Sequence, residues 1–212
     1  MIKRIIFDLD ETLISWLDDY FIGFIPKMKE YNVIDKDEDL LKFVSIVDEY
    51  ENYNTRYEKD LFIKFLNDKL NKDLPIEFYY EFENYFSFCI PKEKDLNVFK
   101  ILDYLKDKYE LVILTNFFEK SQTKRMENYG IKHYFKEIYG GDKYIKPYKE
   151  SYLMACGENK PSECIMIGDN YINDYCGAIK AGLKAIYLNK KNKELDKDVT
   201  SVNSLIELKD IL

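Results

Sequence analysis

The chain has 212 residues, of which 46% are hydrophobic, and this is enough for one domain, or a domain with a smaller insert, around a buried core. Its formal net charge of −7 at pH 7 argues against nucleic acids and anionic membranes as partners, because both require a basic surface. No apolar run is long enough to span a bilayer and the first residues show no signal-peptide pattern, so we expect a cytoplasmic location without membrane association.

The first predicted element is a strand over residues 2–8, and it ends in two aspartates. The Ile-Ile-Phe run at 5–7 is typical of a strand that is buried on both faces of a parallel sheet. Asp8 and Asp10 then lie at the carboxyl end of this strand, where open α/β sheets bind ligands. Two carboxylates so close together disfavour joint ionisation unless a cation is present. The pattern therefore favours a bound Mg²⁺ at this position.

Residues 15–90 form a predicted helical insert, because nothing in them resembles a buried strand and apolar residues recur at helical spacing. One helix is expected near residues 40–51 and another near 57–66, with Thr55 as the candidate N-cap of the second. Pro75 is suited to the first turn of a third helix. The aromatic side chains of the insert either line a pocket or pack in its core, and their helical spacing favours packing.

After residue 91 the sequence alternates between helices and strands, as a parallel α/β sheet does. The predicted helices cover 95–108, 119–129, 149–156, 174–181 and a closing segment over 203–212. The predicted strands cover 111–115, 164–168 and 184–188, with a short one near Ile138. Residues 1–14 and 91–212 are therefore expected to form a doubly wound parallel sheet of the Rossmann type.

Later in the chain, further side chains suited to phosphate or metal chemistry follow predicted strands. Thr115 and Asn116 end the strand at 111–115, and Asp169 follows the strand at 164–168, with Asp174 five residues on. Lys146 lies in a loop just ahead of a helix. Each of these features taken alone is most often a solvated surface feature. Their combination with the two aspartates after the first strand indicates one site at the carboxyl edge of the sheet.

These motifs and their order resemble those of the haloacid dehalogenase superfamily, whose members are mostly phosphatases. The resemblance covers about residues 1–14 and 91–212 and implies a Rossmann-like catalytic core. The insert at 15–90 is at the place where the family carries a helical cap that closes over the nucleophile and selects the substrate. A cap that excludes water suits small phosphorylated metabolites as substrates.

The resemblance implies a role for each side chain that handles the phosphate. Asp8 is expected to attack phosphorus and form an aspartyl-phosphate, while Asp10 protonates the leaving oxygen and then activates water. The Thr115 hydroxyl and the backbone amide of Asn116 are expected to hold phosphate oxygens at the amino end of the next helix. Lys146 is expected to neutralise the phosphate and the nucleophile together.

The expected cofactor is Mg²⁺, and the resemblance also implies its ligands. They are the Asp8 carboxylate, the Asp10 backbone carbonyl and Asp169, an all-oxygen set of the kind that Mg²⁺ prefers. Asp174 is expected to orient Lys146 or a metal-bound water from outside this set. The sequence thus predicts Mg²⁺-dependent hydrolysis of a small phosphate monoester.

Two alternatives to a phosphatase, a phosphomutase and an inactive binding protein, remain open from the sequence. A phosphomutase of the same superfamily uses the same acid/base aspartate and a similar cap. A binding protein that keeps the fold without activity is expected to lose the nucleophile, the acid/base or the metal carboxylate, and here none of them is lost. A serine or cysteine hydrolase would need His133, the only histidine, which lies in a turn without a nucleophile motif. The identity of the substrate depends on which cap side chains face the site, and sequence alone does not give this.

Overall fold

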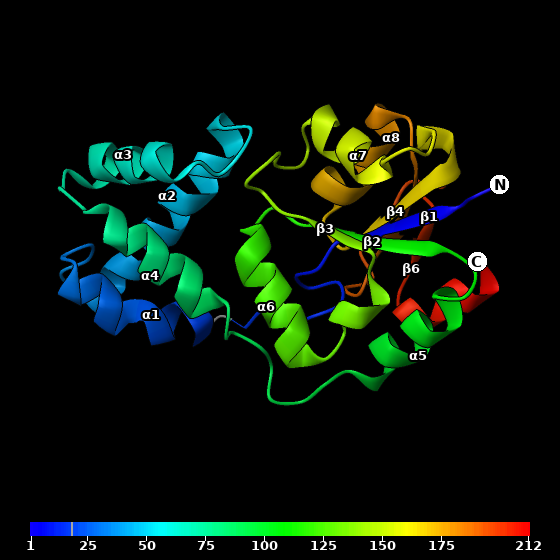
Figure 1. Ribbon diagram of the computed structural model, residues 1–212, viewed down its shortest axis with the longest axis horizontal. Helices are drawn as coiled ribbons and strands as arrows, with labels where there is room; N and C mark the ends of the chain where they lie inside the picture. The colour runs from blue at the N-terminus through cyan, green and yellow to red at the C-terminus, as the bar shows by residue number, and fades with distance from the viewer. Residues whose placement is uncertain (18) are drawn as a thin grey trace.

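The computed structural model describes residues 1–17 and 19–212, and within them a parallel sheet lies beside a bundle of helices (Figure 1). The strands are β1 (Arg4–Phe7), β2 (Glu110–Leu114), β3 (Glu137–Tyr139), β4 (Cys164–Gly168), β5 (Lys184–Leu188) and β6 (Ser201–Val202). They form one sheet in the order β3-β2-β1-β4-β5-β6, and every neighbouring pair is parallel. This is the doubly wound order of the Rossmann type, so the predicted fold class is confirmed.

Helices cover both faces of the sheet because successive side chains of β1 point to opposite sides. Ile5 and Phe7 belong to a core shared with α5 (Leu96–Leu105), α6 (Glu119–Tyr129) and the 3₁₀ helix η5 (Leu205–Asp210). Ile6 belongs to a second core, which it shares with α7 (Lys149–Cys156) and α8 (Gly177–Ala181). The strand sequences are therefore continuous apolar runs, because helices cover both faces of the sheet.

The remaining α-helices form the bundle: α1 (Asp19–Glu30), α2 (Leu40–Tyr53), α3 (Lys59–Leu70) and α4 (Ile76–Phe86). Their core is rich in phenylalanine, with Phe82 fully buried at its centre. Two residues from the sheet half, Phe118 and Ile145, belong to this same core, and the Phe82 and Phe118 ring centroids are 6.0 Å apart. The bundle therefore packs against loops at the carboxyl edge of the sheet (Figure 1). No helix of the described residues is long and apolar enough to cross a membrane.

The structure corrects three sequence expectations. The helix near residues 57–66 begins at Lys59 with Glu58 as its N-cap, and the carbonyl of Thr55 instead accepts the amide of Ile145, so Thr55 is not the cap. The segment predicted as one helix over 174–181 is a π-helix, η4 (Tyr171–Cys176), followed by the short α8. The closing segment is 3₁₀ rather than α-helical, and the two-residue strand β6 before it is too short for any periodicity.

Short 3₁₀ turns complete the described elements. They are η1 (Asp37–Asp39), η2 (Lys132–Tyr134) and η3 (Pro161–Glu163). The strands run from the side of the two termini towards the bundle, so their carboxyl ends face α1–α4 (Figure 1). Residues that follow these strands are therefore placed between the sheet and the bundle.

Candidate active site

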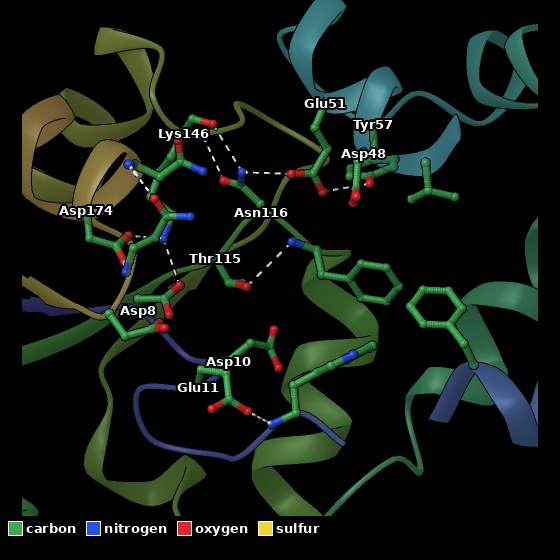
Figure 2. A pocket seen from close by; sticks show the side chains of 17 residues that line it. Asp8, Asp10, Glu11, Asp48, Glu51, Tyr57, Thr115, Asn116, Lys146 and Asp174 are labelled. Atoms are coloured by element: carbon green, nitrogen blue, oxygen red, sulfur yellow. Dashed lines mark hydrogen bonds and ion pairs between the residues drawn. The ribbon is translucent and has the colours of Figure 1, made fainter. Parts of the chain in front are cut away.

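A cavity of about 450 Å³ lies between the carboxyl edge of the sheet and the bundle (Figure 2). Every site residue predicted from the sequence lines it: Asp8, Asp10, Thr115, Asn116, Lys146, Asp169 and Asp174. The bundle and the chain leading to it contribute Trp16, Phe21, Val47, Asp48, Glu51 and Tyr57. The volume is that of a site for a small molecule.

Backbone pairing continues one residue beyond the strands and fixes the first site residues. The amide of Asp8 donates to the carbonyl of Ile167 at 2.9 Å, and the amide of Thr115 donates to the carbonyl of Tyr139 at 3.0 Å. At the end of β4, a Cβ on Gly168 would lie 2.2 Å from an oxygen of Asp174. Glycine at this position therefore lets the Asp174 carboxylate come close to the strand end.

Lys146 is the centre of the charged network. Its Nζ lies 2.7 Å from Asp8 Oδ1 and 2.6 Å from Asp174 Oδ1, and the side chain is buried. Burial alone would lower the pKa of Lys146, but the charges of Asp174 and Asp8 outweigh it and raise the pKa above its ordinary value. The ammonium therefore keeps its charge and joins two carboxylates.

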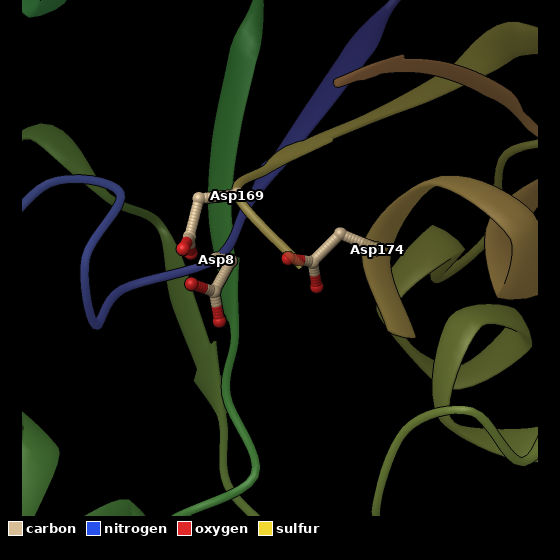
Figure 3. Close-up of side chains that lie close together, drawn as sticks. All are labelled: Asp8, Asp169 and Asp174. Atoms are coloured by element: carbon tan, nitrogen blue, oxygen red, sulfur yellow. The ribbon is translucent and has the colours of Figure 1, made fainter. Parts of the chain in front are cut away.

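Asp8, Asp169 and Asp174 each offer a carboxylate oxygen within 4.8 Å of the others (Figure 3). Burial raises the pKa of Asp8 to about 8; the charge of Lys146 opposes this rise, and those of Asp174 and Asp169 add to it. Burial and the charge of Asp174 raise the pKa of Asp169 to about 6. A hard divalent cation would remove this repulsion, so the donor set fits Mg²⁺. Asp174 belongs to this group, although the sequence placed it outside the ligand set.

The carboxylate of Asp10 points away from this group and is held by α6. Arg125 Nη1 forms an ion pair with Asp10 Oδ1, and Gln122 Nε2 donates to Asp10 Oδ2 at 2.5 Å. Both α6 side chains are fully buried. Sequence reasoning missed them because buried polar side chains do not stand out in so polar a helix. The available signal was their spacing, which places them on the same face as the buried Met126 and Tyr129.

Thr12 is a second residue that the sequence analysis left without a role. Its hydroxyl lies 3.0 Å from Asp8 Oδ2 and 3.3 Å from Asp169 Oδ1, and it accepts the amide of Asp169 at 3.2 Å. Thr12 thus joins the ends of β1 and β4. The signal was its spacing of two residues from Asp10, which continues the spacing of Asp8 and Asp10.

Asn116 connects three parts of the site. Its Oδ1 accepts the Lys146 amide at 2.7 Å, and its Nδ2 donates to the Lys146 carbonyl at 3.1 Å and to Glu51 Oε2 at 3.0 Å. The first amide of α6, from Glu119, donates instead to Asp142, which does not line the cavity. This amide of α6 is therefore occupied within the protein, whereas Thr115 and Asn116 themselves lie in the cavity wall.

Residues 2–182 match the family of haloacid dehalogenase-like hydrolases. The phosphoglycolate phosphatase of Pasteurella multocida is 31% identical over 194 residues, which cover 88% of this chain and 85% of that protein. The glyceraldehyde 3-phosphate phosphatase of Methanothermobacter thermautotrophicus is 28% identical, and the match covers 53% of this chain and 55% of the relative. The pyrimidine 5′-nucleotidase YjjG of Escherichia coli is 29% identical, with 53% of each covered. The chain thus spans about half the length of the last two relatives.

Solved structures of this family share the fold. The putative HAD-hydrolase YfnB of Bacillus subtilis, bound to magnesium, superposes with a TM-score of 0.72 at 18% identity, covering 99% of this chain and 98% of that one. A HAD phosphatase from Thermococcus onnurineus superposes with a TM-score of 0.67 at 24% identity, covering 99% and 97%.

Proposed function

Because the chain belongs to the haloacid dehalogenase-like hydrolase family, we propose that it hydrolyses the phosphate monoester of a small metabolite in the presence of Mg²⁺. The observation that carries this proposal is the buried ammonium of Lys146 between Asp8 and Asp174, beside the carboxylate of Asp169. Such a site can balance a phosphate, a carboxylate nucleophile and a divalent cation in one place.

Asp8 and Asp10 divide the chemistry in this proposal. An oxygen of Asp8 bonds to phosphorus as the bond from phosphorus to the alcohol oxygen breaks, and Asp10 gives that oxygen its proton. Water then attacks the aspartyl-phosphate, Asp10 takes its proton, and inorganic phosphate leaves. Thr115 and Asn116 hold phosphate oxygens, and Lys146 keeps positive charge beside the transferring group.

Asp8, Asp169 and Asp174 are the side chains that we propose to hold Mg²⁺, with the backbone carbonyl of Asp10 as a further ligand. When bound, the ion supplies positive charge that offsets the repulsion between phosphate and carboxylates. The Thr12 hydroxyl would help to orient the carboxylates of Asp8 and Asp169 towards the ion.

We also propose that residues 15–90 act as a cap on a catalytic core made of residues 1–14 and 91–212. Support comes from the cavity, whose lining includes side chains of the bundle as well as of the sheet edge. A cap that closes over the site would keep bulk water from the aspartyl-phosphate and limit the size of the alcohol.

Phosphate release from an aryl phosphate such as p-nitrophenyl phosphate tests the proposal. We expect turnover with Mg²⁺, loss of turnover with a chelator, and recovery when Mg²⁺ is restored. Release of inorganic phosphate in step with the alcohol also separates a phosphatase from a mutase, which would pass the phosphoryl group to a second hydroxyl. Turnover that survives exhaustive chelation, or that survives Asp8→Asn, would contradict the proposal.

A further inference from the structure

The cavity has two chemically different ends. At the sheet edge, Asp8, Lys146 and Asp169 form the proposed phosphate and metal site. At the opposite side, α2 places Asp48 and Glu51 in the cavity wall, one turn apart on the same helix face (Figure 2). An alcohol portion that extends from the phosphate site towards α2 would meet these two carboxylates.

Glu51 reaches the residues that we assign to phosphate binding. Its Oε2 accepts Asn116 Nδ2 at 3.0 Å and its Oε1 accepts the hydroxyl of Tyr57 at 2.8 Å. Glu51 therefore contacts, through Asn116, the segment to which we assign phosphate binding.

Asp48 is a second acceptor in the cavity wall, next to Glu51, which already accepts hydrogen bonds from Asn116 and Tyr57. Asp48 is exposed to solvent where it lines the cavity, so its carboxylate is open to a ligand. A carboxylate can only accept hydrogen bonds when ionised, so Asp48 is matched to a donor on the ligand. Phe21 lines the same cavity, and an aromatic ring there is also compatible with a small cationic group.

The charge of the lining limits what the alcohol can carry. Its carboxylates are those of Asp8, Asp10, Glu11, Asp48, Glu51, Asp169 and Asp174. Among the described lining residues Lys146 is the one basic side chain, and it is already paired with Asp8 and Asp174. A second anionic group on the substrate would find no unpaired basic side chain among the described lining residues and would be repelled by Asp48 and Glu51.

We propose that the substrate is a phosphate monoester whose alcohol carries hydroxyl or ammonium groups that donate to Asp48 and Glu51, and carries no carboxylate. This inference rests on the proposed phosphatase function and narrows it to a substrate class. It excludes phosphoglycolate as the preferred substrate of this chain, because phosphoglycolate carries a carboxylate next to the phosphate ester. Phosphoglycolate is the substrate named for the relative from Pasteurella multocida.

Three phosphate esters with the same short skeleton test the inference: phosphoglycolate, 2-hydroxyethyl phosphate and phosphoethanolamine. They differ only in whether the far end carries a carboxylate, a hydroxyl or an ammonium group. We expect kcat/KM for at least one of the two donor-bearing esters to exceed that for phosphoglycolate by about 10- to 100-fold. Comparing the two donor-bearing esters then shows whether a hydroxyl or an ammonium group is preferred.

Charge substitutions on α2 connect the preference to the two residues. The quantity to compare is the ratio of kcat/KM for phosphoethanolamine to kcat/KM for phosphoglycolate. Asp48→Lys should lower kcat/KM for phosphoethanolamine and raise it for phosphoglycolate, so that this ratio falls by about tenfold or more. Glu51→Gln should reduce the ratio in the same direction. Glu49→Gln is the matched control, since Glu49 neighbours Asp48 on the same helix but pairs with Lys69 outside the cavity. This control removes one charge and should leave the ratio unchanged.

The outcomes separate this inference from the function on which it rests. Hydrolysis of p-nitrophenyl phosphate together with a preference for phosphoglycolate would overturn the inference alone. The inference would also be wrong if Glu51→Gln and Glu49→Gln, which each remove one charge, changed the ratio to the same extent. Absence of hydrolysis for all three esters and for p-nitrophenyl phosphate would overturn the proposed phosphatase, and this inference with it.

Discussion

Arg125 forms an ion pair with Asp10 from a fully buried position on α6. The same guanidinium donates through Nε to the carbonyl of Cys89 at 2.7 Å and lies 5.0 Å from the ring centroid of Trp16. Trp16 and Cys89 lie near the two places where the chain passes between the sheet and the bundle. The position of Asp10, the proposed acid/base, is therefore tied to both connections.

Arg125→Lys keeps the charge but loses the planar fork that reaches Asp10 and Cys89 together. We expect kcat/KM to fall by about 10- to 100-fold for an alkyl phosphate, whose departure needs a proton from Asp10. With p-nitrophenyl phosphate, whose leaving group needs little protonation, phosphorylation of Asp8 in single-turnover assays should fall much less.

Arg4→Lys is the matched control for this substitution. Arg4 is also a buried arginine, and it binds Glu110 and the Ala155 carbonyl at the opposite end of β1 from the site. It should lower stability without changing the difference between alkyl and aryl phosphates. If Arg125→Lys slowed both phosphates equally, the positioning role would be disproved.

Asp8→Asn is expected to stabilise the fold when no divalent cation is present. Because burial raises the pKa of Asp8 to about 8, ionising this carboxylate costs free energy in the folded protein. For a carboxyl with a raised pKa, that cost is absent at low pH and grows as pH rises from about 4 towards 8. The substitution should therefore add about 1–3 kcal/mol to the free energy of unfolding near pH 7.5, and less near pH 5.

Urea unfolding in chelator at both pH values measures this difference. Asp107→Asn, at an exposed position, gives the background effect of losing a charge. A wild-type protein that is more stable than Asp8→Asn at pH 7.5 without metal would show that Lys146 more than compensates for the burial of Asp8.

The affinity for Mg²⁺ should rise with pH between about 6 and 8. The ligand carboxylates must be ionised to bind the ion, and burial raises the pKa of Asp8 to about 8 and that of Asp169 to about 6. Binding in this range should therefore release protons. Titration calorimetry in two buffers with different ionisation enthalpies measures both effects, and an affinity that does not change between pH 6 and 8 would contradict the assignment of these ligands.

The sequence was sufficient to locate the site because its chemistry follows buried parallel strands. Apolar runs identify such strands, and their carboxyl ends meet at one edge, so the residue pattern alone predicts that Asp8, Thr115 and Asp169 lie together. Lys146 could be identified only in combination with the other motifs, because its burial between two carboxylates is a tertiary contact that the sequence does not reveal.

The partners on helices could not be predicted in the same way. Gln122 and Arg125 on α6, and Asp48 and Glu51 on α2, belong to polar residue types that are usually exposed to solvent. Their place in or beside the cavity depends on how the bundle packs against the sheet. That arrangement is set by contacts such as Phe82 with Phe118, which are far apart in sequence.

The central claim is that Asp8 is the nucleophile and Asp10 the acid/base, and phosphate bound covalently to the protein measures it most directly. With p-nitrophenyl phosphate and Mg²⁺, Asp10→Asn should form the aspartyl-phosphate and hydrolyse it about 10²–10⁴-fold more slowly than the wild type. Rapid quench and intact mass should then show one phosphate on Asp8 in the Asp10→Asn protein and none in the Asp8→Asn protein. Phosphate on the Asp8→Asn protein, or equal failure of both variants to form the intermediate, would contradict the account.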